Sequence, residues 1–401
     1  MEKTFTQIIE SYRPWLVEIR RDLHRHPELA FEEVRTAGIM AESLKSFGLE
    51  FRTGVGKTGV VGLLRKNPDG PTIAIRGDMD CLPIQEENDV PYVSTRPGLM
   101  HACGHDAHTT IILGTARFLS ENPEFLEGVP GQVKFIFQPA EEGRAGAAAM
   151  IRDGVLSDPP VDAIFGAHMV HTLPAGAMGL TPGAALAAFD RIEIHVTGRG
   201  GHAARPQSTV DPVVTASYLV TALQSIVSRN INPLESAVLT IGSINAGNAF
   251  NVIPSSAVLV GTLRTMSEEV RLLARKRIQE MSEQVAAAFG ATAEVEIEEG
   301  YPMMYNDPDM TAFFGRALRA EWGEEPVKDL PPIMASEDFA YYLEQVQGTY
   351  FRLGCGNVER GITHSMHTSR FDIDEDVLPF GVTVFAYLIR EYLKRAQGTD
   401  A

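Results

Sequence analysis

The sequence predicts an α/β fold: a mostly parallel sheet forms one domain, and a smaller α+β domain is inserted into it. Before residue 187 and after residue 298, short apolar runs alternate with helical stretches, as in parallel strands with covering helices. Between these parts the predicted strands alternate polar and apolar residues, which is typical of a sheet with one exposed face. We therefore expect boundaries at 1–186, 187–298 and 299–401, with the first and last parts forming one domain.

Composition and charge exclude several classes of partner. The chain has 401 residues and a formal net charge of -17, which disfavours nucleic acid and anionic membranes. Its three cysteines, Cys81, Cys103 and Cys355, are an odd and sparse set that fits a reducing compartment. The N-terminus lacks the apolar core of a signal peptide, and no apolar run approaches the ~20 residues that cross a bilayer. We expect a cytoplasmic protein.

The first predicted helix has apolar residues at helical spacing, at Trp15, Ile19 and Leu23, and Pro27 ends it. His24 and His26 lie at its C-terminal end. Because cations are favourable there, surface histidines are the preferred interpretation over metal ligands.

Three apolar runs, at 71–76, 132–137 and 161–166, are predicted strands that each finish in titratable residues. Because functional groups in such sheets gather at the carboxyl ends of the strands, we expect one site there. The residues concerned are Asp78 and Asp80, Glu141 and Glu142, and His168.

The inserted part has the order β-α-β-β-α-β, which is the ferredoxin-like arrangement. Its predicted strands are 190–197, 237–241, 257–263 and 293–297, and its predicted helices are 211–229 and 267–289. After residue 301 we expect a strand at 349–353 and a terminal helix at 377–395.

The stretch 100–108 holds three histidines, a cysteine and an aspartate directly before an apolar helix. Metal ligation is the favoured interpretation of Cys103, while a nucleophile paired with a histidine and an inert core cysteine stay open. Thiolate and imidazole favour Zn, Co or Ni, and carboxylate also tolerates Mn. The candidate ligands are Cys103, His105, Glu142, His168 and either His364 or His367.

Glu141 and Glu142 are adjacent carboxylates, which repel unless positive charge compensates them. A bound dication would supply that charge, with one carboxylate as ligand and the other accepting a proton from water. A solvated turn is the alternative, and the same choice applies to Asp78 and Asp80. For His202, in the glycine-rich stretch 198–206, functional and structural interpretations are equally supported.

Five motifs, at 76–83, 100–106, 138–143, 201–204 and 251–254, resemble the M20 metallopeptidase family over nearly the whole chain. The resemblance is closer to its amidohydrolase branch, which includes hippurate, indole-acetyl-amino-acid and other N-acyl-amino-acid hydrolases. It implies a zinc-peptidase-like catalytic domain made of 1–186 and 299–401, with 187–298 as a lid and dimerisation domain.

The resemblance also implies roles for individual residues. Cys103 matches a bridging ligand that is usually aspartate in other branches, and Asp78 stands where many peptidase members have a histidine. Arg205, Pro206 and Gln207 replace a common Pro-His pairing. The remaining matches are the ligands His105, Glu142, His168 and His367 (preferred to His364), the general base Glu141, the metal-orienting Asp80, His202 reaching the scissile carbonyl from a dimer partner, and Asn251, Arg264 and Gly354 near the substrate.

These matches imply a hydrolase with two divalent ions (Zn, Mn, Ni or Co) that cleaves N-acyl amino acids into a carboxylic acid and a free amino acid. Arg264 and Asn251 would hold the free carboxylate of this small-molecule substrate. The small domain would form a homodimer or homotetramer. The alternatives are a hydrolase of small dipeptides or other amides (carboxypeptidase-like), a thiol hydrolase using Cys103, and a non-catalytic metal-dependent binding protein.

Overall fold

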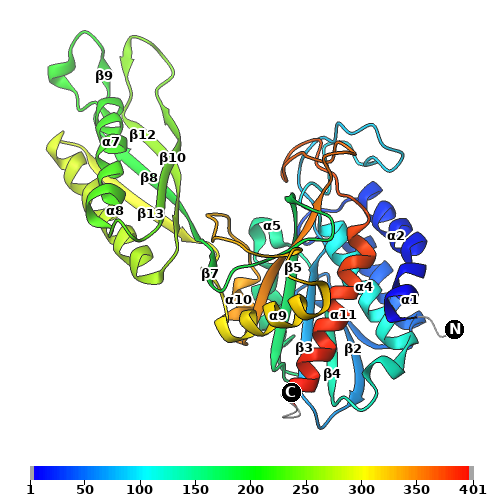
Figure 1. Ribbon diagram of the computed structural model, residues 1–401. Coiled ribbons are helices and arrows are strands. Elements are labelled where there is room, and N and C mark those ends of the chain that lie inside the picture. Colours follow the sequence, from blue (N-terminus) through cyan, green and yellow to red (C-terminus); the bar gives the residue numbers. More distant parts are fainter. Residues whose placement is uncertain (1–3, 397–401) are drawn as a thin grey trace. The chain divides into compact units, whose positions relative to one another are not determined.

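The computed structural model describes residues 4–396, which form two compact units (Figure 1). The first unit comprises the chain up to Gly183, Tyr305–Pro331 and the part from Tyr341 onward. The second comprises Ala184–Met304 and Pro332–Ala340. The chain thus leaves the first unit at residue 184 and, after a short return, contributes nine further residues to the second.

The first unit is built on an eight-stranded sheet in the order β1-β2-β4-β3-β5-β16-β6-β15. The central strands β4, β3, β5 and β16 are parallel, whereas β1, β2 and the β16–β6 pair are antiparallel. This confirms the predicted α/β class. The strands are β1 Glu50–Val55, β2 Gly59–Asn67, β3 Thr72–Asp78, β4 Gly131–Gln138, β5 Ala163–Pro174, β6 Met178–Leu180, β15 Val327–Asp329 and β16 Gly348–Gly356.

Helices cover this sheet, and α4 is central among them because it packs against β3, α2 and α11. Fourteen of its residues are buried, which explains its apolar sequence. The helices are α1 Phe5–Ser11, α2 Arg13–Arg25, α3 Val34–Ser46, α4 His105–Glu121, α5 Glu141–Arg144, α6 Gly146–Arg152, α9 Pro308–Trp322, α10 Ala340–Leu343 and α11 Val377–Arg395, with a 3-10 turn at Pro123–Leu126.

Two sequence-based expectations are wrong in this unit. The strand predicted at 161–166 runs on to Pro174, so His168 lies within β5 rather than after it. The reason is that β16 pairs alongside it, with Arg352 opposite His168 and Gly354 opposite Val170. His24 is not a surface residue either: it is fully buried between acidic side chains.

The second unit has the predicted β-α-β-β-α-β order, and its four strands form an antiparallel sheet in the order β10-β12-β8-β13. Helix α7 begins after Asp211, whose carboxylate accepts from Val213 N and Val214 N, and α8 begins after Ser267 in the same way. A core separate from that of the first unit lies between the helices and the sheet. The elements are β8 Ala188–Thr197, α7 Pro212–Asn230, β10 Ala237–Ala246, β12 Ser256–Thr265, α8 Glu268–Ala288 and β13 Thr292–Glu299.

Short strands complete the chain. Strands β9 (Gly201–His202) and β11 (Val252–Ile253) form an antiparallel ribbon, and β7 (Gly183–Leu186) pairs with β14 (Met304–Asn306). A 3-10 turn covers Pro206–Ser208. Among residues 4–396, no helix is both long and apolar enough to cross a membrane.

A buried charge cluster joins β8 to α8 in the second unit. Asp190 has no exposed surface, and its Oδ1 accepts from Arg271 Nη2 at 2.7 Å and Arg275 Nη2 at 2.6 Å. Burial opposes ionisation of Asp190, but the two guanidinium groups hold its pKa below the usual range. Asp190 is therefore the buried anion that the two arginines share, and the more exposed Glu299 also meets both of them, at 3.5 and 3.2 Å.

We expect Asp190→Asn to lower the unfolding free energy of the second unit by about 3 kcal/mol, because two arginines lose their shared anion. Urea unfolding monitors this loss, with the exposed Glu294→Gln as control. Since the folded pKa of Asp190 is depressed, its contribution is present above the unfolded pKa of about 3.9 and is lost as the pH falls through the folded value. The difference from wild type should therefore be constant between about pH 5 and 8 and shrink below about pH 4. Equal stability of the two proteins at pH 7 would contradict this account.

Candidate metal centre

Two groups of ligand atoms meet at Cys103 in the first unit. Cys103, His105 and His168 form one group, and Cys103, Glu142 and His367 form the other. Within each group the ligand atoms lie within 4.8 Å of one another. The thiol sulfur is 3.4 Å from His168 Nε2 and 3.3 Å from His367 Nε2. The sulfur is thus the atom that the two groups have in common.

The loop before α4 places Cys103 and His105 side by side. Gly104 between them has φ 88°, a left-handed conformation, and a Cβ there would lie 3.2 Å from two Met169 side-chain atoms. Glycine therefore lets the chain turn directly into α4 while lying against β5. Cys103 is 6% exposed and His105 1%, so both candidate ligands are buried where the helix begins.

Asp80 orients two segments that come from different strands. Its carboxylate accepts hydrogen bonds from Glu141 N at 3.0 Å and Glu142 N at 2.9 Å. His105 Nδ1 lies 3.2 Å from Asp80 Oδ1 and 2.9 Å from the Asp80 carbonyl oxygen. Because both are acceptors, Nδ1 carries the proton, and the lone pair of Nε2 faces the ligand cluster.

The turn after β4 has an unusual backbone that presents the two glutamates. Ala140 has φ 56°, and its N–H donates to Glu33 Oε1 at 2.8 Å. Glu141 is 7% exposed, and one of its carboxylate oxygens groups with ligand atoms of His105 and Glu142 within 4.8 Å. The buried Glu33 carboxylate therefore stabilises a strained turn that brings both glutamates to the cluster.

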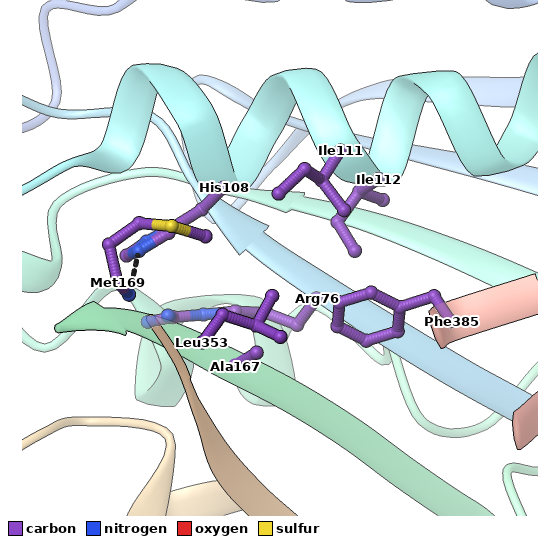
Figure 2. Close-up of a pocket in the computed structure, with 8 residues that line it drawn as sticks. All are labelled: Arg76, His108, Ile111, Ile112, Ala167, Met169, Leu353 and Phe385. Atoms are coloured by element: carbon purple, nitrogen blue, oxygen red, sulfur yellow. Dashed lines mark hydrogen bonds between the residues drawn. The ribbon is translucent and has the colours of Figure 1, made fainter. Parts of the chain in front are cut away.

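His168 is fixed by its neighbours on β5 and α4. Its Nδ1 is 2.8 Å from the Met169 carbonyl oxygen, so Nδ1 donates and Nε2 faces Cys103. His108 Nε2 accepts from Met169 N at 2.9 Å, as Figure 2 shows, and its Nδ1 donates to Asp78 Oδ1 at 2.7 Å. His108 therefore supports β5 and Asp78 rather than facing Cys103.

Hydrogen bonds from Arg76 extend this network of polar side chains. Arg76, on β3, donates through Nη1 to Asp78 Oδ2 at 2.5 Å and through Nε to Gln138 Oε1 at 2.8 Å. The space that Arg76 and His108 line with apolar side chains of α4, β5, β16 and α11 has no room for water (Figure 2). Burial opposes ionisation of Asp78, yet Arg76 and the nearby histidines hold its pKa well below the usual range. This support is consequently dry and rigid.

His367 reaches the cluster from a loop near the C-terminus. It has φ 62°, which is uncommon for a residue other than glycine, and its N–H donates to the Ala102 carbonyl oxygen at 2.8 Å. Nε2 lies 3.3 Å from Glu142 Oε1 as well as close to Cys103. His364, the alternative from sequence, belongs to none of the ligand groups found among the described residues.

The donor set fits divalent metal ions. Among the described residues, the buried cluster atom His105 Nε2 has no hydrogen-bond partner, and the buried Glu142 Oε1 meets only His367 Nε2, at 3.3 Å. Buried polar atoms with too few partners are costly, and a cation would give both atoms a partner. One thiolate, three imidazoles and one carboxylate suit borderline ions such as Zn, Co and Ni.

The pKa values of two candidate ligands predict that metal binding would be coupled to proton release. Burial raises the pKa of the Cys103 thiol. Hydrogen bonds to Cys103 and Glu142 raise the pKa of His367 to about 10. Both groups must lose their protons to coordinate a metal, so binding would release protons here.

The structure places the other predicted residues in different units. Gly354 lies on β16 of the first unit, and a Cβ there would lie 2.0 Å from the Pro174 carbonyl oxygen, so only glycine fits. His202, Asn251 and Arg264 all belong to the second unit. The Asn251 carbonyl accepts from Ala203 N at 3.2 Å beside His202, whereas Arg264 donates to the Met334 carbonyl at 2.9 Å.

Sequence reasoning missed a buried network next to the ligands. Arg20 has no exposed surface, and its guanidinium meets Asp106 and Asp372, each at 2.9 Å. His24 Nδ1 lies 2.7 Å from Asp106 Oδ2. The network ties α2 to the first turn of α4 and to the segment after His367. The signal was present: Arg20 and His24 are one helical turn apart, on the buried side of α2 that also carries Leu16 and Leu23.

Comparisons with known proteins agree with this geometry. A sequence model of peptidase family M20/M25/M40 matches residues 74–391. The N-acetyl-L-cysteine deacetylase of Bacillus subtilis is 42% identical over 380 residues, covering 95% of this chain and 88% of that protein. Thermostable carboxypeptidase 2 of Saccharolobus solfataricus is 37% identical over 384 residues, covering 95% and 96%. The structure of the Bacillus subtilis YXEP protein, a dinuclear metal-binding M20 peptidase, matches with a TM-score of 0.83 and 35% identity, covering 96% and 99%.

We expect Asp80→Asn to weaken metal binding by roughly 10- to 100-fold, because the amide cannot accept from all the donors that now converge on the carboxylate. Competition with a chromogenic chelator measures the affinity, with the exposed Asp69→Asn as control. An unchanged affinity in Asp80→Asn would show that the ligands keep their positions without this carboxylate.

Proposed function

We propose that this chain, which belongs to the peptidase family M20/M25/M40, is a two-metal hydrolase that cleaves the amide bond of N-acyl amino acids. The family match confirms the resemblance drawn from its motifs. The observation that carries the proposal is the pair of donor groups that share Cys103, with Glu141 beside them. The products would be a carboxylic acid and a free amino acid.

In this proposal Cys103 would be a ligand of both of two divalent ions, Zn, Mn, Ni or Co. His105 and His168 would hold one ion together with Cys103, and Glu142 and His367 would hold the other. When bound, the ions would supply Lewis-acid activation of the attacking water and of the amide carbonyl. Asp80, which holds His105 and the Glu141–Glu142 turn, is a positioning residue.

Glu141 acts as the general base. Its carboxylate lies at the edge of the ligand cluster without being needed in either Cys103 group, so it is placed to accept a proton from the attacking water. The same carboxylic acid then returns that proton to the amine nitrogen as the C–N bond breaks. Because Glu141 takes one proton from water and gives one proton to the leaving amine, it ends the reaction in its starting ionised form.

The substrate carboxylate is assigned to Arg264. Asn251, which lies beside His202, would reach it from a neighbouring subunit, and the Gly354 backbone is assigned to the same substrate. Burial lowers the pKa of Arg264, and no carboxylate of a described residue forms an ion pair with it. A desolvated guanidinium with no counter-ion suits a bidentate carboxylate ligand.

His202 is assigned to stabilise the oxyanion that forms on a substrate bound in the site of a neighbouring subunit. Within the second unit, β12 runs from Ser256, at the end of the sheet next to the His202 ribbon, to Arg264 near the other end. Eight residues of strand span roughly 26 Å, too far for one small substrate to touch both residues of one chain. A homodimer or homotetramer formed through the second unit, which would also serve as a lid, would supply His202 in trans.

Three alternatives are weaker. A thiol hydrolase needs a thiolate nucleophile, but burial raises the pKa of Cys103 in the metal-free site. A binding protein would not need Glu141 at the cluster. Action on small dipeptides is the third alternative, because one relative is named as a carboxypeptidase and another as a deacetylase.

The three cysteines are free and buried, in keeping with a cytoplasmic enzyme.

We expect Glu141→Gln to keep both metal ions and lower kcat on N-acyl amino acids by about 10²- to 10⁴-fold, because only proton transfer is removed. Elemental analysis and steady-state kinetics measure the two effects, with the exposed Glu127→Gln as control. Chelation of the wild type should abolish turnover, and added metal should restore it. Wild-type kcat in Glu141→Gln, or activity that survives chelation, would refute the mechanism.

Mixing two inactive variants tests the trans role of His202. Glu141→Gln and His202→Ala have defects in different halves of a composite site, so a mixed dimer would contain one intact site. Co-expression should restore about a quarter of the wild-type activity, since about half the dimers are mixed and each has one working site. If no activity returns although mass spectrometry detects mixed dimers, His202 does not act across subunits.

A further inference from the structure

The side chain of Arg352 projects from the same face of the central sheet as that of the candidate ligand His168. The two residues are register partners on the parallel strands β16 and β5. Partners in adjacent strands project from one face, about 4.8 Å apart. Tyr350, two residues before Arg352, confirms the face, because its ring centroid is 6.5 Å from that of His168. A long cationic side chain therefore starts one strand away from the metal centre, within the first unit.

No carboxylate of a described residue forms an ion pair with the Arg352 guanidinium. The side chain is half-buried, and its one hydrogen bond among the described residues runs from Nη2 to the Pro331 carbonyl oxygen, at 3.4 Å. Burial lowers the pKa of Arg352, and no neighbouring carboxylate offsets the effect. The buried arginines Arg20, Arg76 and Arg271 each meet at least one carboxylate.

A partly desolvated cation without a counter-ion costs free energy unless a ligand provides the anion. Arg352 has five N–H donors in a fork that matches a carboxylate, and one long bond to a neutral oxygen leaves most of them for a ligand. The protein as a whole carries a net charge of -17, so an anionic substrate needs such a local cation.

We propose that Arg352 binds a second carboxylate of the substrate, which makes dianionic N-acyl amino acids the preferred class. This inference rests on the proposed function, in which Arg264 already takes the carboxylate common to all N-acyl amino acids. The additional carboxylate belongs either to the side chain of the amino acid, as in N-acetylglutamate, or to the acyl group, as in N-succinylglutamine. N-acetylglutamine is the reference compound, because it lacks the second charge, matches N-acetylglutamate in shape and has the same amino acid as N-succinylglutamine.

Calorimetry on the metal-loaded Glu141→Gln protein measures binding without consuming the compounds. We expect N-acetylglutamate or N-succinylglutamine to bind roughly 10- to 100-fold more tightly than N-acetylglutamine, the size expected of a charge-assisted hydrogen-bonded pair. Adding Arg352→Gln should remove that preference and leave N-acetylglutamine binding within about twofold, while Arg352→Lys should keep part of it. The exposed Arg316→Gln should change nothing.

Steady-state kinetics of the wild type and Arg352→Gln with the same three compounds complete the test. The ratio of kcat/KM for the preferred dianion to that for N-acetylglutamine should fall by the factor lost in binding. The inference is overturned if the wild type binds all three compounds equally, or if Arg352→Gln weakens all three alike. If Arg352-dependent selectivity appears in binding but no compound is hydrolysed, the proposed function fails while this assignment stands.

Discussion

The carboxylate of Asp80 is the contact on which the centre depends. It joins the end of β3 to the first residue of α4 through His105, and to the turn after β4 through Glu141 N and Glu142 N. These segments are distant in sequence, and each carries a group assigned to ligation or proton transfer. One acceptor group therefore fixes the orientation of an imidazole and the path of a backbone turn at once.

The parallel arrangement of the central sheet makes this contact possible. Strands β4, β3 and β5 lie side by side and in the same direction, so their carboxyl ends bring the glutamate turn, Asp80 and His168 to one edge. The cost is local strain, seen in the positive φ values of Ala140 and His367. Buried partners stabilise both: Glu33 accepts from Ala140 N, and the Ala102 carbonyl accepts from His367 N.

Much of this could be predicted from the sequence because it follows from local patterns. Period-two and period-3.6 patterns indicated the strands, the two long helices of the second unit and the terminal helix, which spans Val377–Arg395 as expected. Residues at strand ends indicated where Asp80, Glu141 and Glu142 would meet. His367 could be preferred to His364 only through the family resemblance.

What could not be predicted depends on pairing between distant segments. The length of β5 is set by β16, nearly 200 residues away, so His168 was wrongly placed after its strand. His24 was assigned to the surface because its partners, Asp106 and Glu86, come from segments that share no sequence pattern with α2. That no carboxylate of a described residue pairs with Arg352 could not be predicted either, because ion pairing depends on the folded chain.

The proposed mechanism needs two metal ions that share the Cys103 sulfur as a ligand. A crystal structure of the zinc-loaded protein, with anomalous data collected at the zinc edge, tests it most directly. Two anomalous peaks are expected about 3.5–4 Å apart, each about 2.3 Å from Cys103 Sγ. One peak is expected beside His105 and His168, and the other beside Glu142 and His367. A single ion, or two ions that leave the thiol uncoordinated, would contradict it.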